Sequence, residues 1–538
     1  MGIPSYFSYI IKNYKNIVIG LKKIKENGTE IDNLYMDCNS IIYDAISNVV
    51  FDENIENNII KNVIENIEKY IQLIKPSDTV LIAFDGVAPL AKMKQQKTRR
   101  YKTHFMSKIN LLNDEADTSE HWNTSKITPG TDFMNNLSEK INFHFNYKEK
   151  EKEYNIKKII VSTSKEYGEG EHKIFEYIRI NKETIKNQIT MIYGLDSDLI
   201  MLSILHCHLF ENIFIFREAP EFLKSFVICS EEIDENEPHY VLDVNLLKKY
   251  VIVQMNCDTT DFHRIYDYVF LCFLLGNDFL PHFPAINIRR RGIDILLNFY
   301  CKIVKEKKDF YFISKNDFKI KWRNFNLFIK ELAKYETEFI IEEYTLREKN
   351  NEKKKYDLIR TKKEKEQFFQ NIPIIYRQEE NYICPIENKW EERYYKILFQ
   401  EERNNENLKK ICKNYMEGLE WTLRYYIEGC PNYRWCYNYN YPPLLFDLKN
   451  HIPDFEKQFI TENKKPFSAN VQLAFVMTKE NSYLLPTKLQ KIINDKYSFI
   501  YGNNEIKFSW AFCRYFWETH VCFQKINLNI LEKWDREF

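Results

Sequence analysis

No stretch of this sequence is apolar over a length that could span a membrane, and its N-terminus has no signal-peptide pattern. The 12 cysteines form no CxxC pair, and most lie in apolar contexts, which favours reduced, buried thiols over a zinc site. One Cys/His cluster, residues 206–208, adjoins an apolar run, which favours packing over metal binding. We therefore expect a monomeric protein of the cytoplasm, with the nucleus as the alternative, that does not bind membranes.

The sequence also lacks net charge, because 77 basic residues balance 77 acidic ones. This balance does not exclude a nucleic-acid ligand, since a local stripe of positive charge matters more than the total. With 538 residues, of which 44% are hydrophobic, the chain is long enough for several domains or for one elaborated domain. No internal repeat is visible in it.

Residues 1–300 alternate between short β-branched strands and amphipathic helices. The candidate strands are 33–37, 79–85, 157–164 and 189–196, and the clearest helices are 56–74 and 265–276. The strands are apolar at consecutive positions, which is typical of a parallel sheet covered by helices on both faces. The sequence therefore predicts an α/β fold for this part of the chain.

The composition changes further along the chain. Residues 347–367 are dominated by charged side chains, which indicates a solvated connector or a long exposed helix. The segment that follows is rich in aromatic residues and needs a core of its own. We predict three parts: a core at 1–345, a charged linker or exposed helix at 346–379, and a largely helical second region at 380–538 that packs on the core.

Acidic residues follow the candidate strands, at the edge where an open parallel sheet binds its ligands. Asp37 and Asp85 close the first two strands, and the motif "YGEGEHK" (167–173) follows the third. A single acid at such a position can simply cap a helix or interact with its dipole. The set as a whole has seven members: Asp37, Asp85, Glu169, Glu171, Asp196, Asp198 and Asp278.

Seven carboxylates at one edge repel one another unless cations neutralise them. Oxygen ligands without Cys or His favour Mg²⁺, with Mn²⁺ as the alternative. Two such ions about 3.5–4 Å apart can activate a water and stabilise the leaving oxygen in phosphodiester hydrolysis. The glycines of residues 167–173 let the backbone turn tightly enough for Glu169 and Glu171 to face inward, while helix capping by these residues stays open.

A basic segment, "GVAPLAKMKQQKTRR" (86–100), follows Asp85 directly, and Pro89 suits the start of a helix. Four of its side chains fall at i, i+4, i+7 and i+8 and share one helix face. These side chains are Lys92, Gln96, Arg99 and Arg100. The face could be an ordinary solvated one, but its position beside the acids favours binding of a phosphate.

Aromatic residues lie where a nucleic acid could stack. Tyr43 is six residues after Asp37, and five aromatic side chains alternate along residues 433–441. The alternating segment is either a stacking platform for bases or core packing, and core packing is favoured for most of its members. Its aromatic residues are Tyr433, Trp435, Tyr437, Tyr439 and Tyr441.

Together these motifs resemble the 5′→3′ exoribonucleases of the Xrn/Rat type, which are relatives of the flap endonucleases. The resemblance rests on "MGIPSYF", "YMDCNSIIY", "FDGVAPLAKMKQQKTRR", "ITPGTDFM", "YGEGEHKI", "YGLDSDLIML" and "LLGNDFLPHFP", in the family's order. The segment "EGLEWTLRYYIEGCPNYRWCYNYNYPP" (417–443) resembles the family's second conserved region. The motifs extend to about residue 485.

The resemblance implies a PIN/flap-nuclease-like, mostly parallel sheet and an appended helical region. It implies a hydrolase that degrades single-stranded RNA carrying a 5′ monophosphate, processively and from the 5′ end, with release of mononucleotides. By position, the seven acids would hold two Mg²⁺ ions, and the four residues of the basic helix would bind the 5′ phosphate. Tyr43 and Trp435 would lie near the first bases. Protein partners are unknown.

Three departures from the family pattern stand out. Tyr43 replaces a family histidine, which keeps stacking but removes any proton transfer, and Leu90 replaces a family arginine beside the phosphate helix. The chain also lacks the long C-terminal extension of the large members, so the resemblance implies a compact form, of viral or protist type. Two rival functions are a structure-specific 5′ or flap DNA nuclease and an inactive RNA-binding scaffold; retention of all seven acids disfavours the scaffold.

Overall fold

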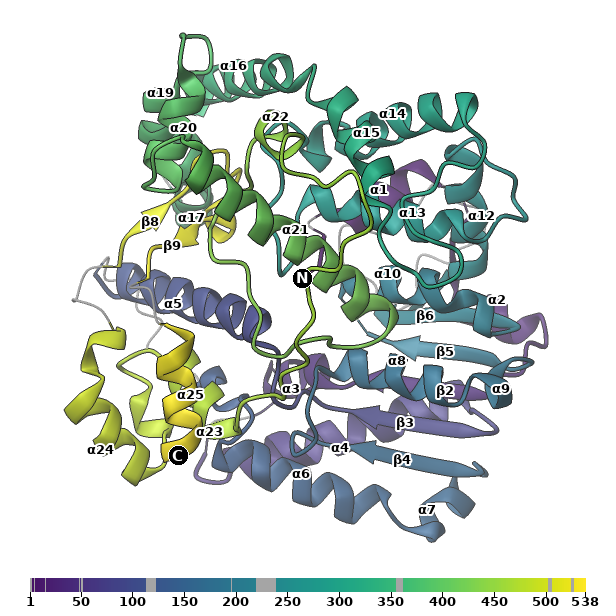
Figure 1. Cartoon of the computed structure of the whole chain (residues 1–538). Coiled ribbons are helices and arrows are strands. Elements are labelled where there is room, and N and C mark those ends of the chain that lie inside the picture. The colour runs from purple at the N-terminus through teal and green to yellow at the C-terminus, as the bar shows by residue number, and fades with distance from the viewer. Residues whose placement is uncertain are drawn as a thin grey trace.

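The structure is a computed structural model, and it describes residues 2–3, 5–14, 16–47, 49, 52–112, 122–194, 196–218, 239–354, 361–501, 506–523 and 527–538. Within these residues, a seven-stranded sheet with the order β1-β7-β6-β5-β2-β3-β4 organises the first half of the chain (Figure 1). Its strands are β1 (Val18–Gly20), β2 (Asn33–Asp37), β3 (Thr79–Ala83), β4 (Lys158–Ser162), β5 (Ile189–Tyr193), β6 (Asn212–Glu218) and β7 (His239–Asp243).

The sheet is mostly parallel, as predicted. Strands β6, β5, β2, β3 and β4 pair in parallel, whereas β7 pairs antiparallel with both β6 and β1. The four predicted strands are β2 to β5, each confirmed within a few residues. Strands β1, β6 and β7 were not predicted; β1 has only three residues, too few for a period to be visible.

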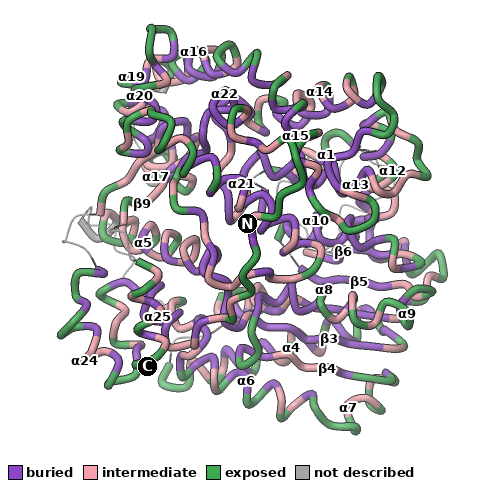
Figure 2. Tube along the Cα trace, in the orientation of Figure 1, coloured by how far each residue is buried: buried purple, intermediate pink, exposed green. Residues whose placement is uncertain are grey.

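Helices cover both faces of the sheet, which explains why the strands are apolar at consecutive positions. Leu34 and Met36 of β2 point into one core, which they share with several helices, whereas Tyr35 points into the opposite core. Figure 2 shows the central strands β2, β3, β5 and β6 buried along most of their length, whereas the edge strand β4 is only partly buried. The helices on the two faces include α3 (Asn39–Ser47), α4 (Ile55–Ile74), α6 (Asp132–Phe145), α8 (Gly170–Ile180), α10 (Ser197–His206), α12 (Val244–Gln254) and α13 (Arg264–Cys272).

The second half of the chain is largely helical and packs against the sheet region in two places. Helix α21 (Asn405–Ile427) contacts α10, and α23 (Ala469–Val476) contacts the long helix α5 (Leu90–Leu112). Other helices here include α14 (Gly292–Glu306), α15 (Trp322–Leu332), α16 (Glu336–Lys354), α17 (Lys362–Gln370), α19 (Gln378–Ile383), α20 (Trp390–Leu398), α24 (Thr487–Lys496) and α25 (Leu528–Glu537). A short pair, β8 (Phe508–Ser509) and β9 (His520–Val521), completes the region.

The last part of the chain builds a small third core around the start of α5. Leu90 and Met93 of α5 pack there with side chains of α23, α24 and α25, among them the fully buried Trp534. Figure 1 shows α5 lying between these C-terminal helices and the rest of the helical region. Leu90 is therefore a core residue.

The charged segment differs in part from the solvated connector or exposed helix that the sequence indicated. Helices α16 and α17 contain its two described parts, but Arg347 of α16 is buried, not solvated. Its guanidinium pairs with Glu380 and donates to the carbonyl oxygen of Cys513 at 2.8 Å. The three-part division of the chain stays a prediction. Among the described helices, none is both long and apolar enough to cross a membrane.

Candidate metal-binding acid cluster

The seven predicted acids gather at the carboxyl edge of the sheet. Asp37 is the last residue of β2, and Asp85 follows β3 by two residues. Glu169 and Glu171 stand at the start of α8, and Asp196 and Asp198 at the start of α10. Because β2 to β5 run parallel, these segments begin at the same edge. Asp278 reaches the cluster from the loop after the 3₁₀ helix η3 (Phe273–Leu275).

Asp85 connects two of the strand ends. Its Oδ1 accepts a hydrogen bond of 2.7 Å from the backbone N–H of Gly170, at the start of α8. Its other oxygen accepts from the side-chain amide of Asn39, whose own oxygen accepts the Asp85 N–H at 3.1 Å. The Asp85 carboxylate is thereby fixed between the segments after β2 and β4.

Burial and mutual repulsion disfavour the ionised form of the carboxyl groups in the cluster. Burial raises the pKa of Asp85 to about 6, and repulsion by Glu169 adds to this shift. Burial likewise raises the pKa of Asp198 to about 6, together with repulsion by Asp278. The pKa values of Asp37 and Glu171 are also raised, mainly by burial. Such a group of carboxylates is stable in ionised form only when positive charge is close.

Lys92 supplies one such charge. Its Nζ lies 2.5 Å from Glu169 Oε2 and 2.9 Å from Asp278 Oδ2, and its side chain is almost fully buried. Although burial works in the opposite direction, Lys92 lowers the pKa of Asp278 to about 2. Lys92 was predicted to bind a phosphate, which stays a prediction; in the structure it joins α5 to the acid cluster.

The single positive charge of Lys92 does not balance seven acids. The carboxylate and imidazole atoms of the cluster are suitable ligands for divalent cations. Glu169, Glu171 and His172 offer ligand atoms within 4.8 Å of one another. The buried Oδ1 of Asp37 has no hydrogen-bond partner among the described residues. Carboxylate oxygens dominate this set, and they suit hard cations such as Mg²⁺ and Mn²⁺. The residues present therefore fit a divalent-cation site.

The capping role that the sequence left open for Glu169 is wrong for its side chain. Glu169 is the N-cap residue of α8, yet its carboxylate makes no capping hydrogen bond. It turns instead to Lys92 and to the hydroxyl of Tyr425. Asp85 accepts from the first N–H of α8 in its place.

Sequence reasoning missed three residues at this site. Tyr425 and Tyr426 of α21 donate hydrogen bonds of 2.7 Å each, to Glu169 Oε1 and to Asp198 Oδ1. The ring of His172 stacks on Tyr425, with ring centroids 3.6 Å apart. The signal was the pair of consecutive tyrosines inside the motif at 417–443, whose polar ends need partners when buried.

The predicted phosphate-binding face of α5 is only partly open. Gln96 accepts a hydrogen bond of 3.3 Å from Gln472 of α23, which in turn accepts from the Ala88 N–H. Arg100 donates to Thr128, and burial lowers its pKa to about 10. Arg99 is exposed. No pattern in the sequence pointed to Gln472, because it lies nearly 400 residues after the α5 segment that it contacts.

The two predicted stacking residues lie in different surroundings. Tyr43 is 49% exposed, so its ring face is available to a ligand. Trp435 is buried, and its ring stacks on Trp421 with centroids 5.3 Å apart. Tyr437 and Tyr441 are buried as well, which confirms core packing for most of the alternating aromatic segment.

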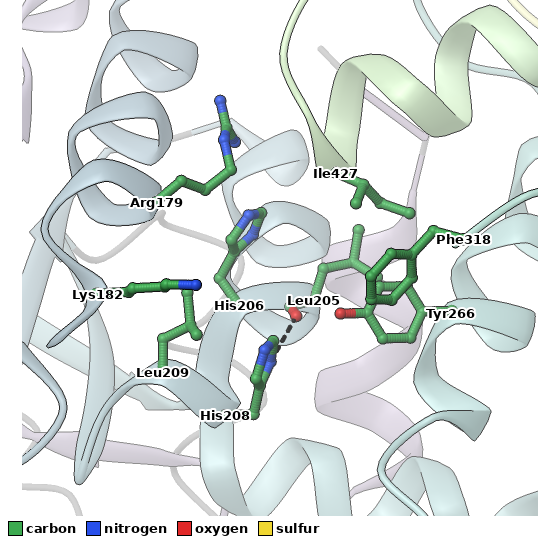
Figure 3. A pocket seen from close by; sticks show the side chains of 9 residues that line it. All are labelled: Arg179, Lys182, Leu205, His206, His208, Leu209, Tyr266, Phe318 and Ile427. Carbon is green, nitrogen blue, oxygen red and sulfur yellow. Dashed lines mark hydrogen bonds between the residues drawn. The ribbon is translucent and has the colours of Figure 1, made fainter. Parts of the chain in front are cut away.

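A cavity of about 270 Å³ lies at the opposite ends of α8 and α10 from the acids (Figure 3). It is lined by Arg179, Lys182, Leu205, His206, His208, Leu209, Tyr266, Phe318 and Ile427. His206 and His208 each donate to a carbonyl of the preceding turn, at 2.8 and 3.1 Å, which agrees with a packing role for residues 206–208. Without a carboxylate in its lining, the cavity is separate from the acid cluster.

Fold and site together define a PIN-like α/β protein, in which the carboxyl edge of a mostly parallel sheet carries clustered acids. Residues 1–219 match the model of the XRN 5′-3′ exonuclease N-terminus. Residues 259–384 and 376–523 match the model of the Xrn1 helical domain. The chain belongs to the XRN 5′-3′ exonuclease family.

Individual relatives agree with this assignment. The chain is 24% identical to 5′-3′ exoribonuclease 2 of Debaryomyces hansenii, over 92% of its own length and 65% of that protein. It is 26% identical to 5′-3′ exoribonuclease 1 of Saccharomyces cerevisiae, over 93% of its length and 40% of that protein. It is 27% identical to 5′-3′ exoribonuclease 1 of Homo sapiens, over 92% of its length and 32% of that protein. The chain thus spans less than two thirds of each of these relatives.

Proposed function

We propose that this chain is a metal-dependent 5′→3′ exoribonuclease. Its substrate would be single-stranded RNA with a 5′ monophosphate, degraded processively to mononucleotides. The observation that carries the proposal is the meeting of seven acids at one sheet edge, in a family whose named relatives are 5′-3′ exoribonucleases. Burying several ionised carboxylates close together destabilises the fold, and binding RNA alone does not require such a cluster.

The acid cluster would hold two Mg²⁺ ions, with Mn²⁺ as the alternative. When bound, such ions supply an activated water and neutralise charge on the scissile phosphate. Asp85 is already fixed by Gly170 and Asn39, so its carboxylate would need little reorganisation. The buried Oδ1 of Asp37, which has no hydrogen-bond partner among the described residues, would be a further ligand atom.

The basic face of α5 would select the 5′ end. The exposed Arg99 offers a guanidinium fork for a terminal phosphate, and Lys92, Gln96 and Arg100 lie on the same helix. A phosphate bound there would be joined to the acid cluster through Lys92, whose Nζ already contacts Glu169 and Asp278. Tyr43 would accept the first base on its exposed face. Trp435 is buried against Trp421, and its position near the first base stays a prediction from the resemblance.

The decisive experiment uses 3′-labelled RNA that carries a 5′ monophosphate, a 5′ triphosphate or a 5′ hydroxyl, with Mg²⁺ and the purified chain. We expect mononucleotide release from the monophosphate RNA only. Equal degradation of all three would refute selection by α5, and preferential cleavage of a matched 5′ flap DNA would favour the DNA nuclease instead.

A double substitution, Asp196→Ala with Asp198→Ala, tests the role of the acids. We expect RNA hydrolysis to fall by more than about 1,000-fold, because several kcal/mol of metal-based stabilisation is lost. RNA binding, measured by fluorescence anisotropy, should change by less than about threefold. Persisting hydrolysis would show that these acids are not the metal ligands.

A further inference from the structure

Helix α21 brings two consecutive tyrosines onto the acid cluster. Tyr425 and Tyr426 are both almost fully buried, with exposed fractions of 2% and 1%. Their hydroxyls donate to Glu169 Oε1 and Asp198 Oδ1, both at 2.7 Å. The contacts join segments more than 220 residues apart in the chain, so the helical half of the protein holds two acids of the sheet half directly.

Neighbouring residues on a helix point about 100° apart, so they rarely serve one site. Here the two acids belong to different helix starts, α8 for Glu169 and α10 for Asp198. Helix α21, labelled in Figure 1, contacts α10 and reaches the start of α8 through Tyr425. The ring of Tyr425 is fixed by stacking on His172 and by Trp421 at 4.8 Å. The ring of Tyr426 packs edge-on against Phe273 at 5.3 Å.

A neutral donor on one carboxylate oxygen fixes the torsion of that side chain and leaves the other lone pairs free. For Glu169, the second oxygen faces Lys92 and the rest of the cluster. Outer partners of this kind orient metal ligands, and their loss typically lowers metal affinity 10–100-fold. A neutral phenol also adds no charge that would compete with a cation, unlike a lysine.

We propose that Tyr425 and Tyr426 are positioning residues, which hold the carboxylates of Glu169 and Asp198 in the orientation that a divalent cation requires. The expected effect of the two tyrosines on the rate of hydrolysis rests on the proposed function. Their expected effect on cation affinity does not depend on which nucleic acid the protein cleaves.

A merely structural role is the alternative, in which the tyrosines only attach α21 to the sheet region. The same helix supplies a matched control. Tyr415 is fully buried on α21, but its hydroxyl has no hydrogen-bond partner among the described residues. Tyr415→Phe therefore removes a buried hydroxyl of the same helix without touching an acid.

The test compares Tyr425→Phe, Tyr426→Phe and Tyr415→Phe in the full chain. Calorimetric titration with Mn²⁺ should show 10–100-fold weaker binding for each of the first two variants and no change for the third. Hydrolysis of monophosphate RNA should lose kcat with little change in KM, and the loss should shrink as Mn²⁺ is raised. RNA affinity in EDTA should stay constant.

Wild-type Mn²⁺ affinity in both variants would overturn the proposal, as would an equal loss in Tyr415→Phe. If Phe lowers the thermal midpoint, the Mn²⁺ titration is repeated at a temperature where each variant is folded, and the same two outcomes decide. If the wild-type chain bound Mn²⁺ but left RNA intact, the proposed function would fail. The positioning roles would then still be decided by the titration.

Discussion

At Gly170 the chain needs space, not conformational freedom. The sequence suggested that the glycines of residues 167–173 permit a tight turn, and this holds for Gly168, whose φ is +96°. Gly170 instead lies against the acid cluster. A Cβ built there would sit 2.5 Å from Asp37 Oδ1 and 3.3 Å from the carbonyl oxygen of Ala83. Sequence alone could not separate these two reasons, because the second depends on where β2 and α8 meet.

Gly170→Ala is therefore expected to impair function while sparing the fold. The added methyl group must displace the Asp37 carboxylate, whereas alanine in the first turn of α8 raises helix propensity by up to about 1 kcal/mol. Displacement of a catalytic group by about 1 Å costs roughly 100-fold in rate. We expect a loss of that size in kcat on monophosphate RNA, with an unchanged thermal midpoint. A fully active variant would show that Asp37 has room to move.

Helix α5 illustrates what a periodic pattern can and cannot predict. Pro89 and the spacing of Lys92, Gln96, Arg99 and Arg100 predicted the start of the helix and a shared basic face, and the helix begins at Leu90. The pattern could not reveal that Lys92 would turn into the acids or that Gln96 would meet Gln472, because both contacts depend on the packing of distant segments. It also gave no sign of Lys97, a lysine with a 3% exposed fraction.

Lys97 lies among aromatic rings, with Nζ 4.8 Å from the ring centre of Phe475 and 4.9 Å from that of Phe523. Burial lowers its pKa to about 7, whereas the unfolded chain keeps the ordinary value of 10.5. Between these values the unfolded state binds more protons, so stability rises with pH from about 7 to 10.5 and is lowest below pH 7. Keeping the buried amine charged costs on the order of 5 kcal/mol of stability, and its contacts with the aromatic faces offset about 2 kcal/mol of this cost.

Lys97→Met should therefore stabilise the chain by about 3 kcal/mol at pH 6 and by much less at pH 10. Urea unfolding at both pH values measures this, with Lys108→Met, half-exposed on the same helix, as the control. A variant that kept the wild-type pH slope would show that Lys97 is not its source.

At the scale of the whole molecule, one buried ionic group joins segments that the sequence analysis treated as separate. Glu380 of α19 accepts from Arg347 of α16 and from Arg377, with nitrogen–oxygen distances of 2.5 and 2.6 Å. It also accepts the Phe512 N–H at 2.8 Å. A run of charges predicts solvent exposure on average, and it cannot show that one arginine of the run finds a buried partner 33 residues away. Removal of that partner leaves two buried guanidinium groups uncompensated.

We expect Glu380→Gln to destabilise the protein by about 3–5 kcal/mol, the usual cost of breaking a buried ion pair from one side. Gln keeps the shape and one acceptor oxygen, so the loss reports charge and not volume. The comparison variant is Glu342→Gln, exposed on α16, which should change stability by less than about 0.5 kcal/mol. Thermal and urea unfolding measure both variants. Because Glu380 and its two arginines belong to α16, α19 and the residue before α19, and not to the segments that carry the acids, Mn²⁺ affinity below the unfolding transition should match the wild type. A loss of Mn²⁺ affinity at full folding would instead reveal that this buried group and the acid cluster are coupled through the helical half of the chain.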